Sequence, residues 1–325
     1  MATLKDVAAK AGVTVTTVSR MINNRGYVSE ATRANIKAVM KELHYQPNEV
    51  ARALSLQRSN LIGLIVPSSS NMFFCKIIDG IEKYVAQKGY KLLLCNSNHE
   101  MEKEIEYFEM LNANQVAGVI VTSRTQDLEN KIFIDAPVVT FDRIISEKIP
   151  AICVDNFQGG ILATTHLIEQ GARDLAYISG SSDLDMDGNK RYHGFKSVCE
   201  MQGIPHVVVD ANEEQFQEMN YYQVVRQFLD EFPSVTGVFT SNDIIAAEVI
   251  RLCNRRGIKV PQKLKVVGYD DIELCNFTTP QITTIRQPYD DICKLTVEYL
   301  IEMIEDEKTP ESKVLPVSLI QRGST

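Results

Sequence analysis

From Asn60 to about residue 270 the sequence alternates short apolar runs with amphipathic stretches, and this alternation restricts the possible folds more than any other feature. Strands that alternate with helices predict parallel sheets joined by right-handed crossovers. The predicted strands are LIGLIV (61–66), YKLLLC (90–95), VAGVIVT (116–122), PVVTFD (137–142), LAYISG (175–180), HVVVD (206–210), TGVFTS (236–241) and KVVGYD (265–270). The predicted helices cover about 74–88, 101–113, 159–169, 190–202, 217–231 and 243–256.

These strand–helix units form two successive sets, the second of which begins near Gly159. Each set has enough strands for a sheet of its own, so the pattern predicts two similar α/β lobes. In open parallel sheets, ligands bind beyond the carboxyl ends of the strands. Two such lobes are therefore expected to enclose one cleft.

The first 23 residues have a different pattern, that of two short helices around a tight turn. Thr3 and Asp6 have the spacing of a capping box, and a glycine follows where the first helix should end. Thr14 is placed to cap a second helix whose buried side carries Val18 and Ile22. This pattern is that of a helix-turn-helix, whose second helix enters the major groove of DNA. The alternative is a helical hairpin that only completes a core.

A third helix is expected to begin at Ser29, and together the three helices form a small domain. The charge distribution supports contact with DNA at this end only. Residues 1–60 hold nine Lys or Arg against four acids, a net charge of +5, whereas the whole chain carries −8 and the remainder therefore −13. A basic segment attracts phosphates, and an acidic body repels them.

The composition favours a cytoplasmic protein. No run approaches the 18 apolar residues of a membrane helix, and no apolar leader follows the first residues, so we expect neither a membrane segment nor export. The seven cysteines form no CxxC pair, and we expect them to be reduced core residues.

Three segments of the N-terminal region resemble the lactose-repressor (LacI/GalR) family of bacterial transcription regulators: LKDVAAKAGVTVTTVSRMINN, VSEATRANI and LHYQPNEVARAL. The likeness extends to VLPVSLIQRGS at the other end and so covers essentially the whole chain. It implies an α/β protein with a three-helix helix-turn-helix head, a hinge helix and a two-lobed core like a periplasmic binding protein. The implied function is a repressor of sugar or sugar-acid utilisation genes, which binds a pseudo-palindromic operator and is released by a carbohydrate effector.

The resemblance also implies a domain plan. Residues 1–46 would form the DNA-binding domain and 47–59 the hinge. The effector-binding and dimerisation core would cover 60–325, with its first subdomain over about 60–156 and 289–318 and its second over about 157–288 and 319–325. Because no heptads follow the last predicted strand, we expect a homodimer rather than a tetramer.

Family positions assign the DNA contacts. Arg20 is expected to bind a guanine edge, next to the small side chains of Val15 and Thr16. Leu54 would enter the minor groove as a wedge on the hinge helix, unless it packs on the core instead. Asn48, Ala51 and Arg52 belong to the same hinge. Phosphate contacts are expected from short polar side chains: Thr3, Thr14, Thr17, Asn23, Ser29 and Thr32.

The effector residues are expected where strands end. Phe73 and Phe74 follow the first strand and can stack on a sugar ring. Four polar side chains can exchange hydrogen bonds with hydroxyl groups: Asp142, Arg191, Asn242 and Asp270. For Asn242 the alternative is a helix cap. Asp155, Asn156 and Phe216 are looser assignments that rest on the resemblance.

Other functions are less well supported. No nucleophile, zinc or phosphate-loop motif occurs, so neither an enzyme nor a cofactor is expected. The segment 183–188 imitates a calcium loop, but Gly194 stands where a glutamate is required. A purine corepressor is disfavoured because the relevant arginine is missing. A phosphorylated carrier protein remains an alternative corepressor, although Glu298 would repel it, and a sugar-binding transport protein would lack the basic head.

Overall fold

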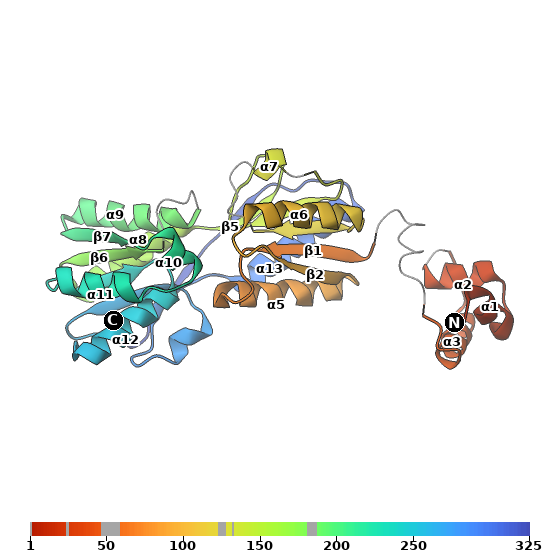
Figure 1. Ribbon diagram of the computed structural model, residues 1–325, viewed down its shortest axis with the longest axis horizontal. Helices are drawn as coiled ribbons and strands as arrows, with labels where there is room; N and C mark the ends of the chain where they lie inside the picture. The colour runs from red at the N-terminus through yellow and green to blue at the C-terminus, as the bar shows by residue number, and fades with distance from the viewer. Residues whose placement is uncertain (1, 24–25, 47–58, 123–127, 132, 181–186) are drawn as a thin grey trace. The chain divides into compact units, whose positions relative to one another are not determined.

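The computed structural model describes residues 2–23, 26–46, 59–122, 128–131, 133–180 and 187–325 (Figure 1). The chain divides into two compact units. The first contains residues 1–60 with the short segment 114–117, and the second contains the remainder.

The described residues of the first unit form three helices, namely α1 (Leu4–Ala11), α2 (Val15–Ile22) and α3 (Glu30–Glu42). Both partners of the predicted capping box are present, because the Thr3 side chain accepts from the Asp6 amide and the Asp6 carboxylate accepts from the Thr3 amide. Val7, Val18 and Ile36 are fully buried at the centre of this helical head. Val18 is buried as predicted, and Ile22 is partly buried against the same core. Met21, which was not predicted, is buried with Val18.

The second unit contains two lobes, each built on a six-stranded sheet. In the first lobe all pairings are parallel, in the order β11-β5-β4-β3-β1-β2. Its strands are β1 (Leu61–Val66), β2 (Lys91–Asn96), β3 (Gly118–Val121), β4 (Val138–Phe141), β5 (Ala151–Val154) and β11 (Lys313–Leu315). Its helices are α5 (Met72–Gln87), α6 (Met101–Ala113), α7 (Leu128–Lys131) and α13 (Tyr289–Glu305).

The second lobe repeats this plan in the order β12-β10-β9-β8-β6-β7, with β12 antiparallel to β10. Its strands are β6 (Leu175–Ser179), β7 (His206–Asp210), β8 (Gly237–Thr240), β9 (Lys265–Asp270), β10 (Thr283–Arg286) and β12 (Ser318–Ile320). Its α-helices are α8 (Asn156–Glu169), α9 (Lys190–Gln202), α10 (Glu213–Gln217), α11 (Tyr222–Glu231) and α12 (Asp243–Arg256). Two short 3-10 helices, η1 (Asp187–Asn189) and η2 (Glu273–Asn276), complete it.

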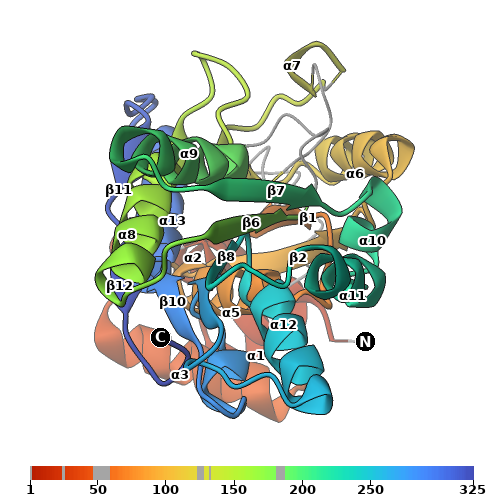
Figure 2. The ribbon, with the colours of Figure 1, turned by 90° about the vertical axis from the view of Figure 1, so that its left-hand side faces the viewer.

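Alternate residues of β6 show why the second sheet is covered on both faces. Leu175 and Tyr177 pack with α8 and α9, whereas Ala176 and Ile178 pack with α11 and α12. Figure 2 shows these two helix pairs on opposite sides of the sheet. A strand buried on both faces reads as a continuous apolar run. This is the pattern from which the parallel sheets were predicted.

The chain passes between the lobes three times: between β5 and α8, between β10 and α13, and between β11 and β12. The predicted fold class is confirmed, whereas some element boundaries were wrong. The expected helix over 217–231 is α11, which begins only at Tyr222 and is preceded by the separate short helix α10. Helix α8 begins at Asn156 rather than near Gly159. Strands β5, β10 and β11 were not predicted.

Helices α8 and α9 approach so closely that their backbones touch. A Cβ atom on Gly160 would lie 2.1 Å from the Arg191 carbonyl oxygen, and one on Gly194 would lie 2.2 Å from the Phe157 carbonyl oxygen. Only glycine fits at either position. The contact brings the first turn of α9 against the first turn of α8, where the candidate site lies.

We predict that Gly160→Ala lowers the free energy of unfolding of the core by about 3 kcal/mol, because the added methyl group would force two backbones apart. Urea denaturation would measure this loss. Gly188→Ala is the control, since its Cβ would lie 3.8 Å from the Arg191 Cζ, an ordinary contact. Equal stability of the two variants would contradict the close packing of α8 on α9.

Candidate functional site

The exposed side of α2 carries the three residues predicted to contact bases. Val15, Thr16 and Arg20 are exposed, whereas Val18 and Met21 face the core of the head. The helix therefore presents two small side chains, Val15 and Thr16, and one long cationic side chain, Arg20, to solvent. This is the arrangement expected of a recognition helix.

The residues predicted to hold phosphates shape the ends of these helices. The Thr14 hydroxyl caps α2 and bonds the Thr17 hydroxyl at 2.9 Å, and the Ser29 hydroxyl caps α3 and bonds the Thr32 hydroxyl at 2.8 Å. The Asn23 side chain donates to the Ser19 hydroxyl at 3.2 Å, and Thr3 caps α1. Their contact with phosphate stays a prediction. The hinge residues Asn48, Ala51, Arg52 and Leu54 lie outside the described residues.

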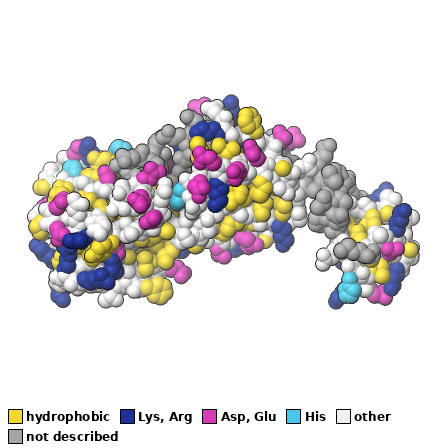
Figure 3. All heavy atoms as spheres, in the orientation of Figure 1, with side chains coloured by type: hydrophobic (Ala, Val, Ile, Leu, Met, Phe, Trp, Pro, Cys, Tyr) yellow, Lys and Arg dark blue, Asp and Glu magenta, His cyan; other side chains and the backbone are white. Residues whose placement is uncertain are grey.

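The surface of the core is acidic. Figure 3 shows carboxylates spread over the face that carries α6, where Glu102, Glu106 and Glu109 are exposed. This agrees with the net charge of −13 outside residues 1–60. The core therefore repels DNA phosphates, and the basic head is the part suited to bind them.

A cleft with about 930 Å³ of empty space, partly open to solvent, lies between the two lobes of the core. It lies where the carboxyl ends of the strands were predicted to meet. All six residues predicted to bind an effector line it: Phe73, Phe74, Asp142, Arg191, Asn242 and Asp270. The structure thus brings together side chains from five separate parts of the sequence.

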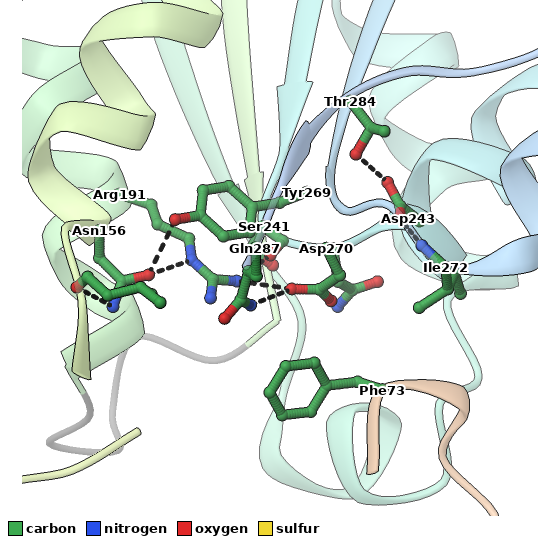
Figure 4. A network of polar contacts seen from close by, with 12 residues as sticks. Phe73, Asn156, Arg191, Ser241, Asp243, Tyr269, Asp270, Ile272, Thr284 and Gln287 are labelled. Carbon is green, nitrogen blue, oxygen red and sulfur yellow. Dashed lines mark hydrogen bonds and ion pairs between the residues drawn. The ribbon is translucent and has the colours of Figure 1, made fainter. Parts of the chain in front are cut away.

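Arg191 is the cation of this cleft, and it is almost completely buried. Its Nε donates to the Asn156 Oδ1 at 2.8 Å, and its Nη1 donates to the Ser241 carbonyl at 2.6 Å and lies 3.8 Å from the Asp270 Oδ1. Its guanidinium stacks on the Tyr269 ring with the Cζ 3.5 Å from the ring centroid. Figure 4 shows these contacts side by side. Arg191 is therefore fixed in place before any ligand binds.

Asn156 connects two of these groups. Its Oδ1 also accepts from the Tyr269 hydroxyl at 3.2 Å, and its Nδ2 donates to the Asp187 Oδ2 at 2.9 Å. It is itself buried. The sequence assigned Asn156 to the site only loosely, whereas the structure gives it the role of holding Arg191.

Asp270 ends β9 and faces the same space. The Gln287 amide donates to its Oδ1 at 2.7 Å. Burial raises the pKa of the Asp270 carboxyl, and Asp243 and Asp142 act in the same direction, whereas Arg191 and Gln287 favour the charged form. Gln287 lies on the segment that passes from β10 to α13, so Asp270 is hydrogen-bonded to one of the connections between the lobes.

Aromatic side chains line the cleft on both sides. Phe73 contacts Phe74 and Tyr289, with ring centroids 5.0 and 5.8 Å apart. In Figure 4 the Phe73 ring lies opposite Arg191, Asp270 and Gln287. On the second lobe Phe216 lies so close to Gly180 that a Cβ there would be 2.6 Å from its ring. Rings at both sides suit a flat or cyclic ligand.

Asn242 and Asp243 are neighbours with different roles, and the sequence could not show which of them lines the cleft. Asn242 lines the cleft and also caps α12, so both of its expected roles are compatible. Asp243, by contrast, is fully buried and accepts from the Thr284 hydroxyl at 2.6 Å and from the Ile272 amide at 2.9 Å. The cleft also includes residues that were not predicted, among them Ser68, Asn71, His99, Tyr177, Ser179, Tyr221 and Gln287.

Within the described part of the chain, no group of three or more His, Cys, Asp or Glu side chains has the geometry of a metal site. Over the same residues no helix is both long and apolar enough to cross a membrane. Of the seven free cysteines, six are buried as expected, whereas Cys75 is exposed.

Comparison with known proteins matches both units. Residues 3–48 match the model for bacterial regulatory proteins of the lacI family, and residues 164–325 match the periplasmic binding protein-like domain. The ribose operon repressor of Halalkalibacterium halodurans is 36% identical over 326 residues, which cover 100% of this chain and 97% of that protein. The sucrose operon repressor of Streptococcus mutans is 38% identical over 324 residues, with 100% and 99% covered.

A solved structure extends the likeness to three dimensions. The lac repressor dimer bound to operator and the anti-inducer ONPF is 27% identical, with a TM-score of 0.86 over 99% of this chain and 98% of that one. The match includes both the helical head and the two lobes.

We predict that Asn156→Ala lowers the free energy of unfolding of the core by about 3 kcal/mol, because the buried Nε of Arg191 would lose its acceptor. The midpoint of urea denaturation measures the loss. Asn254→Ala is the control, since its exposed side chain makes one hydrogen bond, to the Thr279 carbonyl. A loss no greater than that of the control would show that Arg191 does not need Asn156.

Proposed function

The chain belongs to the lacI family of bacterial regulatory proteins, and we propose that it is a repressor whose binding to operator DNA is relieved by a neutral sugar in the interlobe cleft. The family and the absence of an enzymatic role follow from the two domain matches and the relatives. The observation that supports a sugar effector is the interlobe cleft, where Arg191 and Asp270 lie side by side and Phe73 and Phe216 contribute aromatic rings.

For the DNA side, we infer that the chain binds as a homodimer to a pseudo-palindromic operator in the cytoplasm, with α2 in the major groove. Support comes from the exposed side of α2, from the net charge of +5 over residues 1–60 and from the likeness to an operator-bound dimer. Val15 and Thr16 would meet base edges beside Arg20, and Leu54 would enter the minor groove from the hinge formed with Asn48, Ala51 and Arg52.

Arg20→Ala should weaken binding to the operator by about 1–3 kcal/mol and leave binding to unrelated DNA nearly unchanged, because a guanidinium that binds a base edge contributes to selectivity. Fluorescence anisotropy at one fixed salt concentration, with operator and scrambled duplexes, measures both affinities. Lys37→Ala removes an equal charge from an exposed position on α3 and serves as the control. If both variants weakened both duplexes equally, Arg20 would only contact phosphates.

The charges of the cleft support a neutral effector rather than a sugar acid or a sugar phosphate. Among the described lining residues, the carboxylates Asp142 and Asp270 face one guanidinium, that of Arg191. Arg191 is already committed to Asn156 and the Ser241 carbonyl. An anionic ligand would lie beside two acids, one of which, Asp270, is already shifted toward its neutral form by burial, and beside a cation whose Nε and Nη1 have partners. Its buried charge would therefore be poorly compensated.

A neutral sugar fits the remaining groups. Its hydroxyls can donate to the carboxylates and accept from the Arg191 Nη2, which makes no hydrogen bond within the described part of the chain. Its ring can pack on Phe73 and Phe216, one from each lobe. The relatives named above are repressors of ribose and sucrose operons, which is consistent with this class of ligand.

A ligand that binds both lobes changes the free-energy difference between their open and closed arrangements. We propose that it acts on the head in this way. The three segments that join the lobes allow such rearrangement without breaking either sheet. A ligand shifts the equilibrium only by its difference in affinity for the two arrangements. Release of DNA then requires that the sugar bind the arrangement that holds operator less well.

The test is a thermal-shift and operator-release screen of the full-length protein. The neutral panel is D-ribose, D-xylulose, sucrose and cellobiose, and the charged panel is D-gluconate and D-glucose 6-phosphate. We expect at least one neutral sugar to raise the melting temperature and to release operator, and the charged compounds to do neither. Binding of only a charged compound would contradict the neutral assignment. No response to any compound, with operator binding intact, would favour a protein partner as the effector.

A further inference from the structure

Lys76 of α5 reaches from the first lobe into the second. Its Nζ donates to the Asp271 carbonyl at 2.8 Å and lies 4.7 Å from the centroid of the Tyr289 ring. Asp271 follows β9 in the second lobe, and Tyr289 begins α13 of the first. One ammonium thus binds both lobes next to a segment that joins them.

The partners of this ammonium are neutral groups. No carboxylate among the described residues forms an ion pair with Lys76, although the core is acidic. The Asp271 carboxylate is instead taken by Arg286 and Arg322, whose nitrogens lie 2.6 and 2.7 Å from it. Lys76 is therefore directed at the backbone of Asp271, which gives its hydrogen bond a defined direction.

That backbone is held rigidly. Asp270 and Asp271 have φ angles of 108° and 58°, in the left-handed region that non-glycine residues rarely adopt. Such a conformation persists only where the surroundings over-determine it. Here Gln287 holds one carboxylate, and Arg286 and Arg322 hold the other. A bond to the Asp271 carbonyl therefore fixes the donor relative to a stiff part of the second lobe.

The contact lies directly beside the cleft on both of its sides. Lys76 is one helical turn beyond Phe73 on α5, and Phe73 in turn contacts Tyr289. Asp271 is the neighbour of Asp270 in the sequence. The Lys76 contact therefore connects α5, which carries Phe73, to the end of β9, which carries Asp270.

We propose that Lys76 is a positioning residue of the cleft, which sets the distance between Phe73 on the first lobe and Asp270 on the second by binding the Asp271 carbonyl across the gap. It touches no ligand itself. Its effect on the lobes is independent of the proposed function, whereas its effect on sugar affinity rests on that function.

The lobe contact is tested first without any ligand, by hydrogen–deuterium exchange of the full-length protein. Lys76→Met keeps the apolar stem and removes the donor. We expect faster exchange in both peptides that flank the contact, 70–82 in the first lobe and 268–278 in the second. Unchanged exchange in 268–278 would overturn the proposal.

The matched control is Lys83→Met. Lys83 lies on the same helix and over the Tyr84 ring at 5.0 Å, but its ion pair, 3.5 Å to Asp290, stays within the first lobe. We expect it to leave exchange in 268–278 at the wild-type rate. Lys76→Arg retains a charged donor and should restore much of the protection.

The effect on affinity is then measured by calorimetry with D-ribose and sucrose. With a sugar that binds the wild type, Lys76→Met should raise Kd about tenfold, while Lys76→Arg and Lys83→Met stay close to wild type. An unchanged Kd in Lys76→Met would overturn the positioning role. If neither sugar binds the wild type, the same measurement is made with D-xylulose and cellobiose. If none of the four binds, the proposed effector fails, and the exchange experiment still decides the lobe contact.

Discussion

The candidate site depends on the burial of one guanidinium. A buried charge is tolerated only where partners replace the water it has lost. Arg191 of α9 finds them on three other elements: Asn156 on α8, the Ser241 carbonyl after β8, and Tyr269 with Asp270 on β9. A cation over an aromatic ring in a desolvated site contributes up to about 2 kcal/mol. Arg191 thereby contacts α8, which packs on α9 at Gly160, and the ends of strands β8 and β9.

The cleft is lined by residues of both lobes, and this underlies our proposal that a small ligand acts on the DNA-binding head. On the second lobe, Asp270 and Asp271 at the edge of the cleft are held in place by Gln287, Arg286 and Arg322. On the first lobe, Phe73 lines the cleft from α5, the helix that also carries Lys76. A ligand that bound residues of both lobes would favour the arrangement of the lobes for which it has the higher affinity.

Much of this could be read from the sequence because it rests on local signals. The capping box of Thr3 and Asp6 depends only on their spacing of three residues, and the buried strands are recognised as apolar runs. The six predicted cleft residues came from strand ends and family positions, and all of them line one cleft.

What the sequence could not provide depends on contacts between distant segments. Asp243 and Asp270 both follow strands, yet only packing against Thr284 and the Ile272 amide decides that Asp243 is buried while Asp270 faces the cleft. Gln287 was missed because the strand before it, β10, was not predicted. Lys76 gave no signal, since an isolated lysine on a helix usually points to solvent.

The most direct test of the account is the affinity of the effector sugar for the protein with and without saturating operator, measured by calorimetry at one salt concentration. Coupling between two sites is reciprocal. Operator should weaken sugar binding by the same factor by which the sugar weakens operator binding, in the range of about 5-fold to 150-fold. Equal sugar affinity in the two states would contradict it, because a ligand that does not distinguish the two arrangements cannot release the DNA.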